Sequence, residues 1–180
     1  MIEAPQDVLA FWRKAGPKRW FSKSAAFDRR LRTRFLPTYQ AAAAGALSHW
    51  ERKPDSALAL AIVLDQFPRN MFRGNARTFA ADPLARRIVN RAIARGFDRR
   101  VPASMRQFFY LPFEHSESPK DQTRGVALFR ATGDKESLKW AELHADIIRK
   151  FGRFPHRNAV LGRTTTAKER AFLDGGGFSG

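Results

Sequence analysis

Apolar residues recur along most of the chain at the three- and four-residue spacing of one helical face. Phe27, Leu31 and Phe35, for example, follow one another at four-residue intervals. Proline and glycine separate such stretches, because proline interrupts a helix and glycine often ends one. Together these signals predict helices over residues 5–15, 24–44, 56–66, 83–95, 119–132 and 135–151, with short helices after 102 and 166. No stretch alternates between apolar and polar residues as a strand does, so the predicted fold class is all-α.

The stretch 56–66 differs from the other predicted helices because it has no polar face. Apolar side chains point in every direction from its axis: Leu58, Leu60, Ile62 and Leu64. We therefore expect this helix to be central and buried. Asp55 is its expected N-cap, and Pro68 is expected to stop it. Pro37 is expected to kink or divide the preceding helix.

The length of 180 residues suits one ordinary domain, so residues 1–180 are predicted to form a single all-α domain. Thr166 and Glu169 have the spacing of a capping box at the start of the last helix. The tail 174–180 is rich in glycine, which is typical of a disordered end. Phe178 within it nevertheless offers an apolar side chain that can dock on the body of the protein.

The composition excludes some kinds of site and leaves others open. The chain has no cysteine, which excludes disulfides and thiolate metal sites, and its motifs predict no metal and no cofactor. It shows no signal peptide, and its longest apolar run, 57–64, is too short to span a bilayer. We therefore expect a cytoplasmic protein without a membrane segment. The net charge of +16, from 33 Lys and Arg against 17 Asp and Glu, attracts anions without specificity.

Asp65 is the most informative polar position, because it lies on an apolar face of the buried helix. Its carboxylate also lies near the helix C-terminus, where the helix dipole is negative. A carboxylate in such a place needs a cation or hydrogen-bond donors, and Arg69 and Arg157 are the candidates. A structural Asp–Arg clamp is favoured over catalysis at this position.

A second cluster, Glu114, His115 and Glu117, follows an aromatic run. Two carboxylates and an imidazole at this spacing can bind a metal or move protons. The spacing matches no common metal motif, and the plainer interpretation is that the carboxylates pair with arginines. His144 lies on an apolar helix face, where a histidine is usually a satisfied core residue. It gains a functional interpretation if Glu114 or His115 lies near it.

The loop after residue 152 gathers basic and polar side chains: Arg153, His156, Arg157 and Asn158, with Arg163 close behind. Guanidinium groups in a tight loop can hold a phosphate or a carboxylate. They can equally well cap backbone carbonyls around the corner. The related run Phe67-Pro68-Arg69-Asn70 ends the buried helix, which suggests that Arg69 and Asn70 lie at a similar corner.

Arginines also form a ridge on the predicted helix 83–95 and just beyond it: Arg86, Arg87, Arg91, Arg95, Arg99 and Arg100. Such a ridge can follow a phosphate backbone. No nucleic-acid-binding module accompanies it, and the aromatic residues lie in apolar company rather than between arginines. A solvated helix face is therefore the favoured interpretation.

Three blocks of sequence carry a resemblance to a known family. They read LDQFPRN from residue 64 with Arg73-Gly74, FFYLPFEHSE from residue 108, and FGRFPHRN from residue 151 with Leu161-Gly162-Arg163. In this order the blocks resemble the bacterial domain-of-unknown-function family 924 over nearly the whole chain. The resemblance implies a right-handed superhelix similar to tetratricopeptide-repeat folds, and it implies no established activity.

Three functions follow from these patterns. The first is a binding module for a small anionic or zwitterionic ligand or an acidic peptide. Its predicted site residues are Asp65, Arg69, Asn70, Glu114, His115, Glu117, His144, Arg153, His156, Arg157 and Asn158. The second is a hydrolase that uses histidine and glutamate as acid and base, with or without a metal, and the third is nonspecific nucleic-acid association. A cavity in which His115, His144 or His156 approaches a carboxylate would favour the hydrolase, whereas wide separation or full mutual pairing of the polar groups would count against the binding module.

Overall fold

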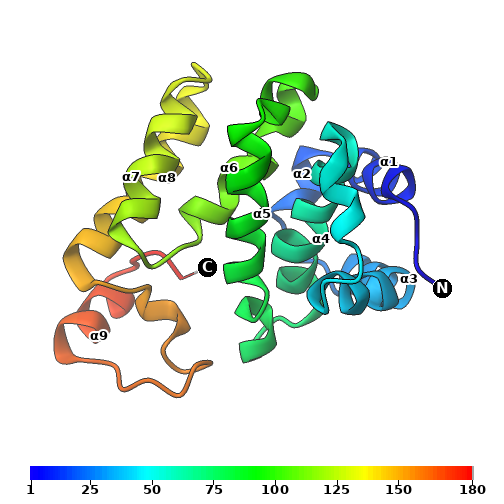
Figure 1. Cartoon of the computed structure of the whole chain (residues 1–180). Helices are drawn as coiled ribbons and strands as arrows, with labels where there is room; N and C mark the ends of the chain where they lie inside the picture. The colour runs from blue at the N-terminus through cyan, green and yellow to red at the C-terminus, as the bar shows by residue number, and fades with distance from the viewer. Residues whose placement is uncertain (180) are drawn as a thin grey trace. The chain divides into compact units, whose positions relative to one another are not determined.

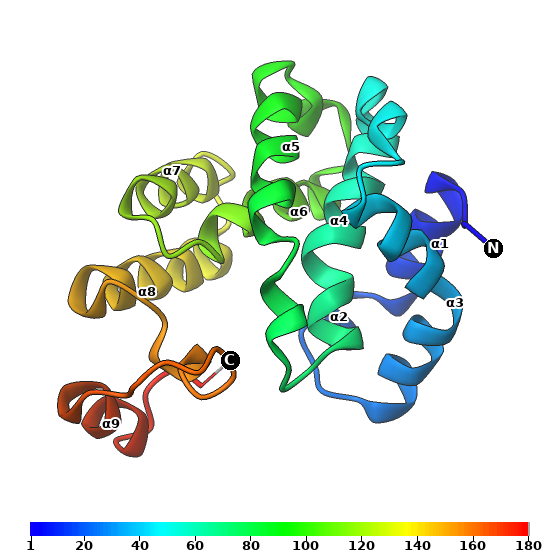
Figure 2. The same cartoon turned by 60° about the horizontal axis from the view of Figure 1, so that its bottom comes forward.

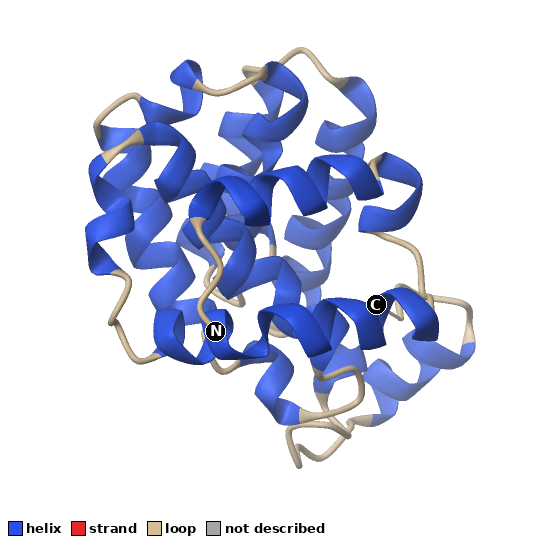
Figure 3. Ribbon diagram, turned by 90° about the vertical axis from the view of Figure 1, so that its right-hand side faces the viewer, coloured by secondary structure: helices blue, strands red, loops and turns tan. Residues whose placement is uncertain are grey.

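A computed structural model describes residues 1–179 of the chain, and every regular element in that range is a helix (Figures 1 and 3). The α-helices are α1 (Pro5–Ala15), α2 (Pro17–Trp20), α3 (Ala25–Ala43), α4 (Pro54–Met71), α5 (Asp82–Ala94), α6 (Ala103–Glu114), α7 (Pro119–Arg130), α8 (Lys135–Phe151) and α9 (Ala167–Asp174). Short 3₁₀ turns lie between them: η1 (Ser48–Arg52), η2 (Ala76–Phe79), η3 (Phe97–Arg100) and η4 (Pro155–Arg157). The predicted all-α class is confirmed, and the tetratricopeptide-like superhelix stays a prediction.

The helices group into two compact units. Unit 1 holds residues 1–73 and 77–112, and unit 2 holds residues 74–76 and the chain from Phe113 onward. The single domain 1–180 remains a prediction.

Helix α4 is the centre of unit 1, as its apolar sequence predicts. It packs against α1, α3 and α5, and Figure 2 shows it lying between the last two. Its residues from Ala57 to Pro68 are all buried. The Phe67 ring lies 5.6 Å from Trp12 and 5.0 Å from Phe35, centroid to centroid, so aromatic side chains from three helices meet there.

Two prolines lie inside helices: Pro68, which was expected to stop its helix, and Pro37, which was expected to kink or divide its own. Helix α4 runs through Pro68 to Met71, and α3 runs through Pro37. Each proline removes one backbone hydrogen bond, and the buried side chains around it, such as Phe67 and Met71, offset that cost. Helix α4 also begins earlier than predicted, with Lys53 as N-cap and Pro54 at the first position, so Asp55 lies within the first turn.

Unit 2 is built on the pair α7 and α8, which lie side by side because a short loop turns the chain back after Arg130. Asp134 caps α8 by accepting hydrogen bonds from the amides of Glu136 and Ser137. The predicted capping box of Thr166 and Glu169 is present at the start of α9.

The apolar core of unit 2 continues past the last helix. Ile147, Ile148 and Phe154 are buried together, and Phe151, Phe172 and Phe178 pack against them. Phe178 therefore docks on the core, although it lies in a glycine-rich segment. None of the helices in residues 1–179 is long and apolar enough to cross a membrane.

Candidate active site

The polar residues that the sequence singles out fall into two groups. Asp65, Arg69 and Asn70 belong to α4 in unit 1. The remaining ones belong to unit 2: Glu114, His115, Glu117, His144, Arg153, His156, Arg157 and Asn158.

The group in unit 1 is a set of ion pairs between helices. Asp65 is only 1% exposed, and Nη1 of Arg69 lies 3.4 Å from its Oδ1. Arg69 also donates two hydrogen bonds, each of 3.0 Å, to the carboxylate of Asp82 at the start of α5. The expected ion pair of Asp65 with Arg69 is present, within α4, and the bonds from Arg69 to Asp82 fasten α4 to α5.

The neighbouring residue Asn70 serves a similar structural purpose. Its side-chain amide donates to Oδ1 of Asp28 over 2.8 Å, and Arg73 donates to Oδ2 of the same carboxylate over 2.7 Å. These contacts fasten the end of α4 to the first turns of α3. The polar groups of this corner are therefore engaged with one another.

Two carboxylates hold the corner after α8 in unit 2. Glu117 accepts two hydrogen bonds from Arg163, of 2.8 and 3.0 Å, and a third from the amide of Phe154. Burial raises the pKa of Glu117, but these donors outweigh burial and hold it below its ordinary value. Glu169, on α9, accepts hydrogen bonds from Arg153 and Asn158.

Arg157 and His115 were also predicted as site residues. Arg157 is buried, and its guanidinium carbon lies 4.4 Å from the ring centroid of Phe154, a cation–π contact. His115 is partly buried in the turn after α6. Ser116, in the same turn, donates its hydroxyl hydrogen to Asp121 over 2.7 Å, so its hydroxyl is already engaged.

Glu114 and His144 form the contact that changes the interpretation of unit 2. Both are buried, with 5% and 6% of their surface exposed. Nδ1 of His144 lies 3.3 Å from Oε1 of Glu114 and 2.8 Å from the carbonyl oxygen of Trp140. The carbonyl oxygen can only accept, so we assign the proton to Nδ1. The lone pair of the neutral imidazole is then on Nε2, which is the arrangement of a general base oriented by a carboxylate.

His156 lies against the same two phenylalanines as His144. The His144 ring centroid is 5.5 Å from Phe154 and 4.6 Å from Phe178, and the corresponding distances for His156 are 5.6 and 5.2 Å. Burial, together with the nearby positive charge of Arg157, lowers the pKa of His156 to about 3. His156 is therefore neutral at physiological pH, and within residues 1–179 its buried Nδ1 has no hydrogen-bond partner.

Gln122, on α7, positions Glu114 and was missed in the sequence. Its side-chain amide donates to the carbonyl oxygens of Glu114 and Ser116 over 2.7 and 2.6 Å, and so satisfies the end of α6. Gly125, one turn later, permits the close approach, because a Cβ there would lie 3.3 Å from Cβ of Phe113. The signal was present: Gln122 lies on the same buried stripe as Gly125 and Phe129.

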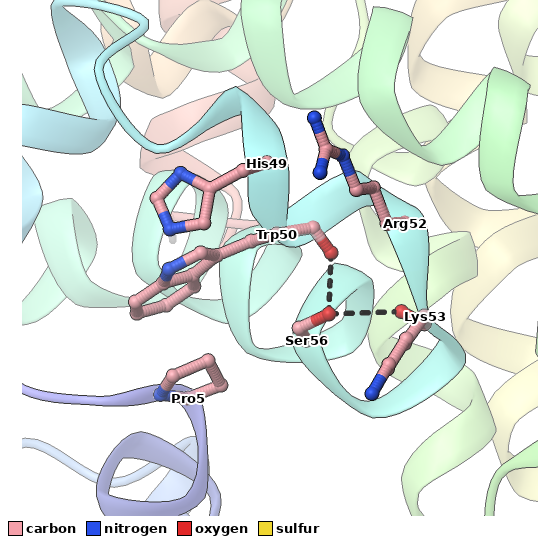
Figure 4. A pocket seen from close by; sticks show the side chains of 6 residues that line it. All are labelled: Pro5, His49, Trp50, Arg52, Lys53 and Ser56. Atoms are coloured by element: carbon pink, nitrogen blue, oxygen red, sulfur yellow. Dashed lines mark hydrogen bonds between the residues drawn. The ribbon is translucent and has the colours of Figure 1, made fainter.

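The structure also contains a shallow hollow in unit 1, of about 320 Å³. Its lining residues are Pro5, His49, Trp50, Arg52, Lys53 and Ser56 (Figure 4). The Ser56 hydroxyl bonds to the backbone carbonyls of Trp50 and Lys53, while the charged ends of Arg52 and Lys53 point apart. This hollow brings no reactive groups together. Residues 1–179 also contain no group of three or more His, Asp or Glu that could hold a metal ion.

The fold and the buried Glu–His pair define an all-helical protein with a candidate acid–base site in unit 2. The chain belongs to the family described as bacterial protein of unknown function (DUF924), whose model matches residues 8–177. It is also similar to a solved structure, the protein of unknown function ATU0120 from Agrobacterium tumefaciens. The two chains are 47% identical with a TM-score of 0.93 over 95% of this chain and 97% of that one. No curated protein was found to match the chain.

Proposed function

We propose that unit 2 contains a hydrolase site in which His144 acts as general base and Glu114 orients its imidazole. The observation that carries the proposal is the position of Nδ1 of His144, between the carbonyl oxygen of Trp140 and the carboxylate of Glu114. This pairing holds the imidazole in one tautomer and one orientation. The apolar rings of Phe154 and Phe178 against His144 strengthen its interaction with the carboxylate by excluding water.

The chemistry follows from the two nitrogens of the ring. Nε2 of His144 takes a proton from a water molecule while the water oxygen attacks the carbonyl carbon of an ester or amide. The imidazolium that forms is stabilised by the Glu114 carboxylate beside Nδ1. The proton then passes from Nε2 to the departing alcohol or amine. No serine or cysteine nucleophile is required.

Binding of a small anion at the helix corners is less well supported by the geometry. Arg69 and Arg163 each make a two-point pair with a carboxylate, and Arg153 is bonded to Glu169. An incoming phosphate or carboxylate would have to displace these carboxylates, and separating a largely buried ion pair is costly. Mutual pairing therefore counts against the binding module.

The arginine ridge on α5 is weakened as a nucleic-acid site for a similar reason. Arg91 donates to both carboxylate oxygens of Glu51, over 2.7 and 2.9 Å, and Arg95 donates to the backbone carbonyl of the same residue. Two of the central charges of the ridge are thus committed within unit 1.

The test is hydrolysis of a panel of p-nitrophenyl esters and anilides by the wild-type chain, His144→Gln and Glu114→Gln. Removing a general base costs roughly a hundredfold or more in rate, so His144→Gln should lose nearly all activity and Glu114→Gln a smaller part. His49→Gln, which changes an exposed histidine of unit 1, is the matched control and should keep full activity. A wild-type rate no higher than that of buffer, or equal rates for wild type and folded His144→Gln, would contradict the proposal.

A further inference from the structure

The ring of Phe178 lies within a group of aromatic side chains at the candidate site. It makes edge-to-face contacts with His144, at 4.6 Å and an interplanar angle of 65°, and with His156, at 5.2 Å and 82°. The Trp140 ring lies 6.4 Å from that of Phe178, centroid to centroid. Aromatic rings prefer edge-to-face and offset arrangements to face-to-face stacking, and such pairs are stabilised beyond the burial of their area. These side chains therefore form a seat suited to a six-membered ring.

The segment that carries Phe178 is fitted to its place by glycine. The amide of Gly177 donates to the carbonyl of Phe172 over 2.9 Å. A Cβ at Gly177 would lie 2.5 Å from that carbonyl oxygen and 2.6 Å from the Phe172 ring, so only glycine can follow this path. Gly176, with φ of +79°, supplies the turn that directs Phe178 toward the imidazoles.

These contacts therefore hold Phe178 in one specific position. The segment that carries it is short, and its release would expose the ring seat, that is, the side chains of Trp140, His144 and His156 around Phe178. The side chain of Phe178 is only partly buried, and Trp140 beside it is 44% exposed, so the seat lies at the surface of unit 2. The buried and unpartnered Nδ1 of His156 within residues 1–179 is a second sign that the site accepts a polar group beside a ring.

We propose that Phe178 occupies the position of an aromatic ring of the substrate, and that residues 175–178 must leave for an aryl or benzyl ester or amide to bind. This inference rests on the proposed function, because it names the substrate class of the same site. The ring of the substrate would replace that of Phe178 against His144 and His156. Its carbonyl group would then face the base.

The experiment measures ring binding without turnover. Phenylacetamide is titrated into the protein while the change in tryptophan fluorescence is followed, and acetamide, which lacks the ring, is the matched ligand. Because a site occupied by its own segment binds a ligand more weakly, Phe178→Ala and Gly177→Ala should each bind phenylacetamide about tenfold more tightly than wild type. Trp140→Phe should abolish the signal.

Phe21→Ala is the matched control, because Phe21 is 61% exposed and belongs to unit 1. It should bind phenylacetamide as wild type does. Melting curves establish that each variant is folded, and a chain ending at Asp174 serves if Phe178→Ala is not. Equal affinity of wild type and the released variants, equal binding of acetamide, or absence of binding by every variant would overturn the inference.

The two proposals fail in different ways. Tighter binding of phenylacetamide by the released variants without any ester hydrolysis would contradict the proposed hydrolase function but support the ring seat. Hydrolysis that depends on His144 but is as fast with ethyl acetate as with phenyl or benzyl acetate would contradict the ring seat alone.

Discussion

Arg153 makes a two-point ion pair with Glu169, in which Nε lies 2.6 Å from Oε1 and Nη2 lies 2.9 Å from Oε2. Oε2 of the same carboxylate also accepts from the Thr166 amide over 2.8 Å and from Asn158 over 3.2 Å. One side chain thus fastens the corner after α8 to the first turn of α9.

Glu169→Gln is expected to lower the free energy of unfolding by ~1.5–3 kcal/mol at neutral pH, the usual value of hydrogen bonds to a charged group. The bond from Arg153 and those from Thr166 and Asn158 lower the pKa of Glu169 from 4.5 to about 2. A depressed carboxyl pKa gives stability that is present above the unfolded value and is lost as pH falls toward the folded one. The difference in melting temperature between wild type and variant should therefore shrink between pH 4.5 and about 2.

Glu142→Gln is the matched control for this measurement. Glu142 pairs with Arg130, but both side chains are largely exposed, and exposed pairs contribute little. A gap between wild type and Glu169→Gln that stayed constant down to pH 2 would contradict the assigned role of Glu169.

Asp65→Ala is expected to destabilise the protein by about 3–5 kcal/mol, because it leaves a partly buried guanidinium without one of its carboxylates. Arg69 keeps Asp82, so the lower end of that range is expected. Urea denaturation followed by circular dichroism measures the change, and Asp55→Ala, an exposed residue in the first turn of the same helix, should leave the midpoint nearly unchanged. An unaltered midpoint for Asp65→Ala would show that the Asp65–Arg69 ion pair does not stabilise the fold.

The fold could be predicted from the sequence largely because the helix signals are local. The boundaries of α8 and the capping box of α9 were obtained from spacing and caps alone. The paths through Pro37 and Pro68 were not, since whether a helix survives a proline depends on side chains that pack around it from other elements. Local patterns carry no information on that packing.

The sequence predicted which residues belong to the candidate site, but not which of them pair with one another. His144 was expected to matter if Glu114 or His115 approached it, and the approach of Glu114 depends on how Gln122 holds the end of α6. Glu169 was identified only as a capping residue, although an acid in a first turn near an arginine-rich corner is a signal for such a pair. The contact of Phe178 with two imidazoles depends on the path of three glycines, which no periodicity reveals.

Gln122→Ala should lower the free energy of unfolding by ~1–3 kcal/mol, because it leaves buried carbonyls at the end of α6 without a donor. It should also reduce any His144-dependent hydrolysis, since Glu114 is no longer held. Urea denaturation measures the first effect and ester hydrolysis the second. Gln40→Ala, on the exposed face of α3, controls for the loss of a glutamine. A Gln122 variant as stable as this control would show that the end of α6 does not depend on the Gln122 amide.

His156 should make the protein sensitive to pH in a range where Glu169 does not. Burial and the nearby positive charge of Arg157 lower the pKa of His156 from 6.5 to about 3. As pH falls through 6.5 the unfolded chain binds a proton that the folded protein cannot bind, so stability falls. His156→Gln, which cannot take up the proton, should flatten the melting temperature between pH 7 and 5 relative to wild type. His49→Gln, at an exposed histidine, should retain the wild-type slope. Equal slopes for wild type and His156→Gln would mean that the folded protein protonates this ring as readily as the unfolded chain does.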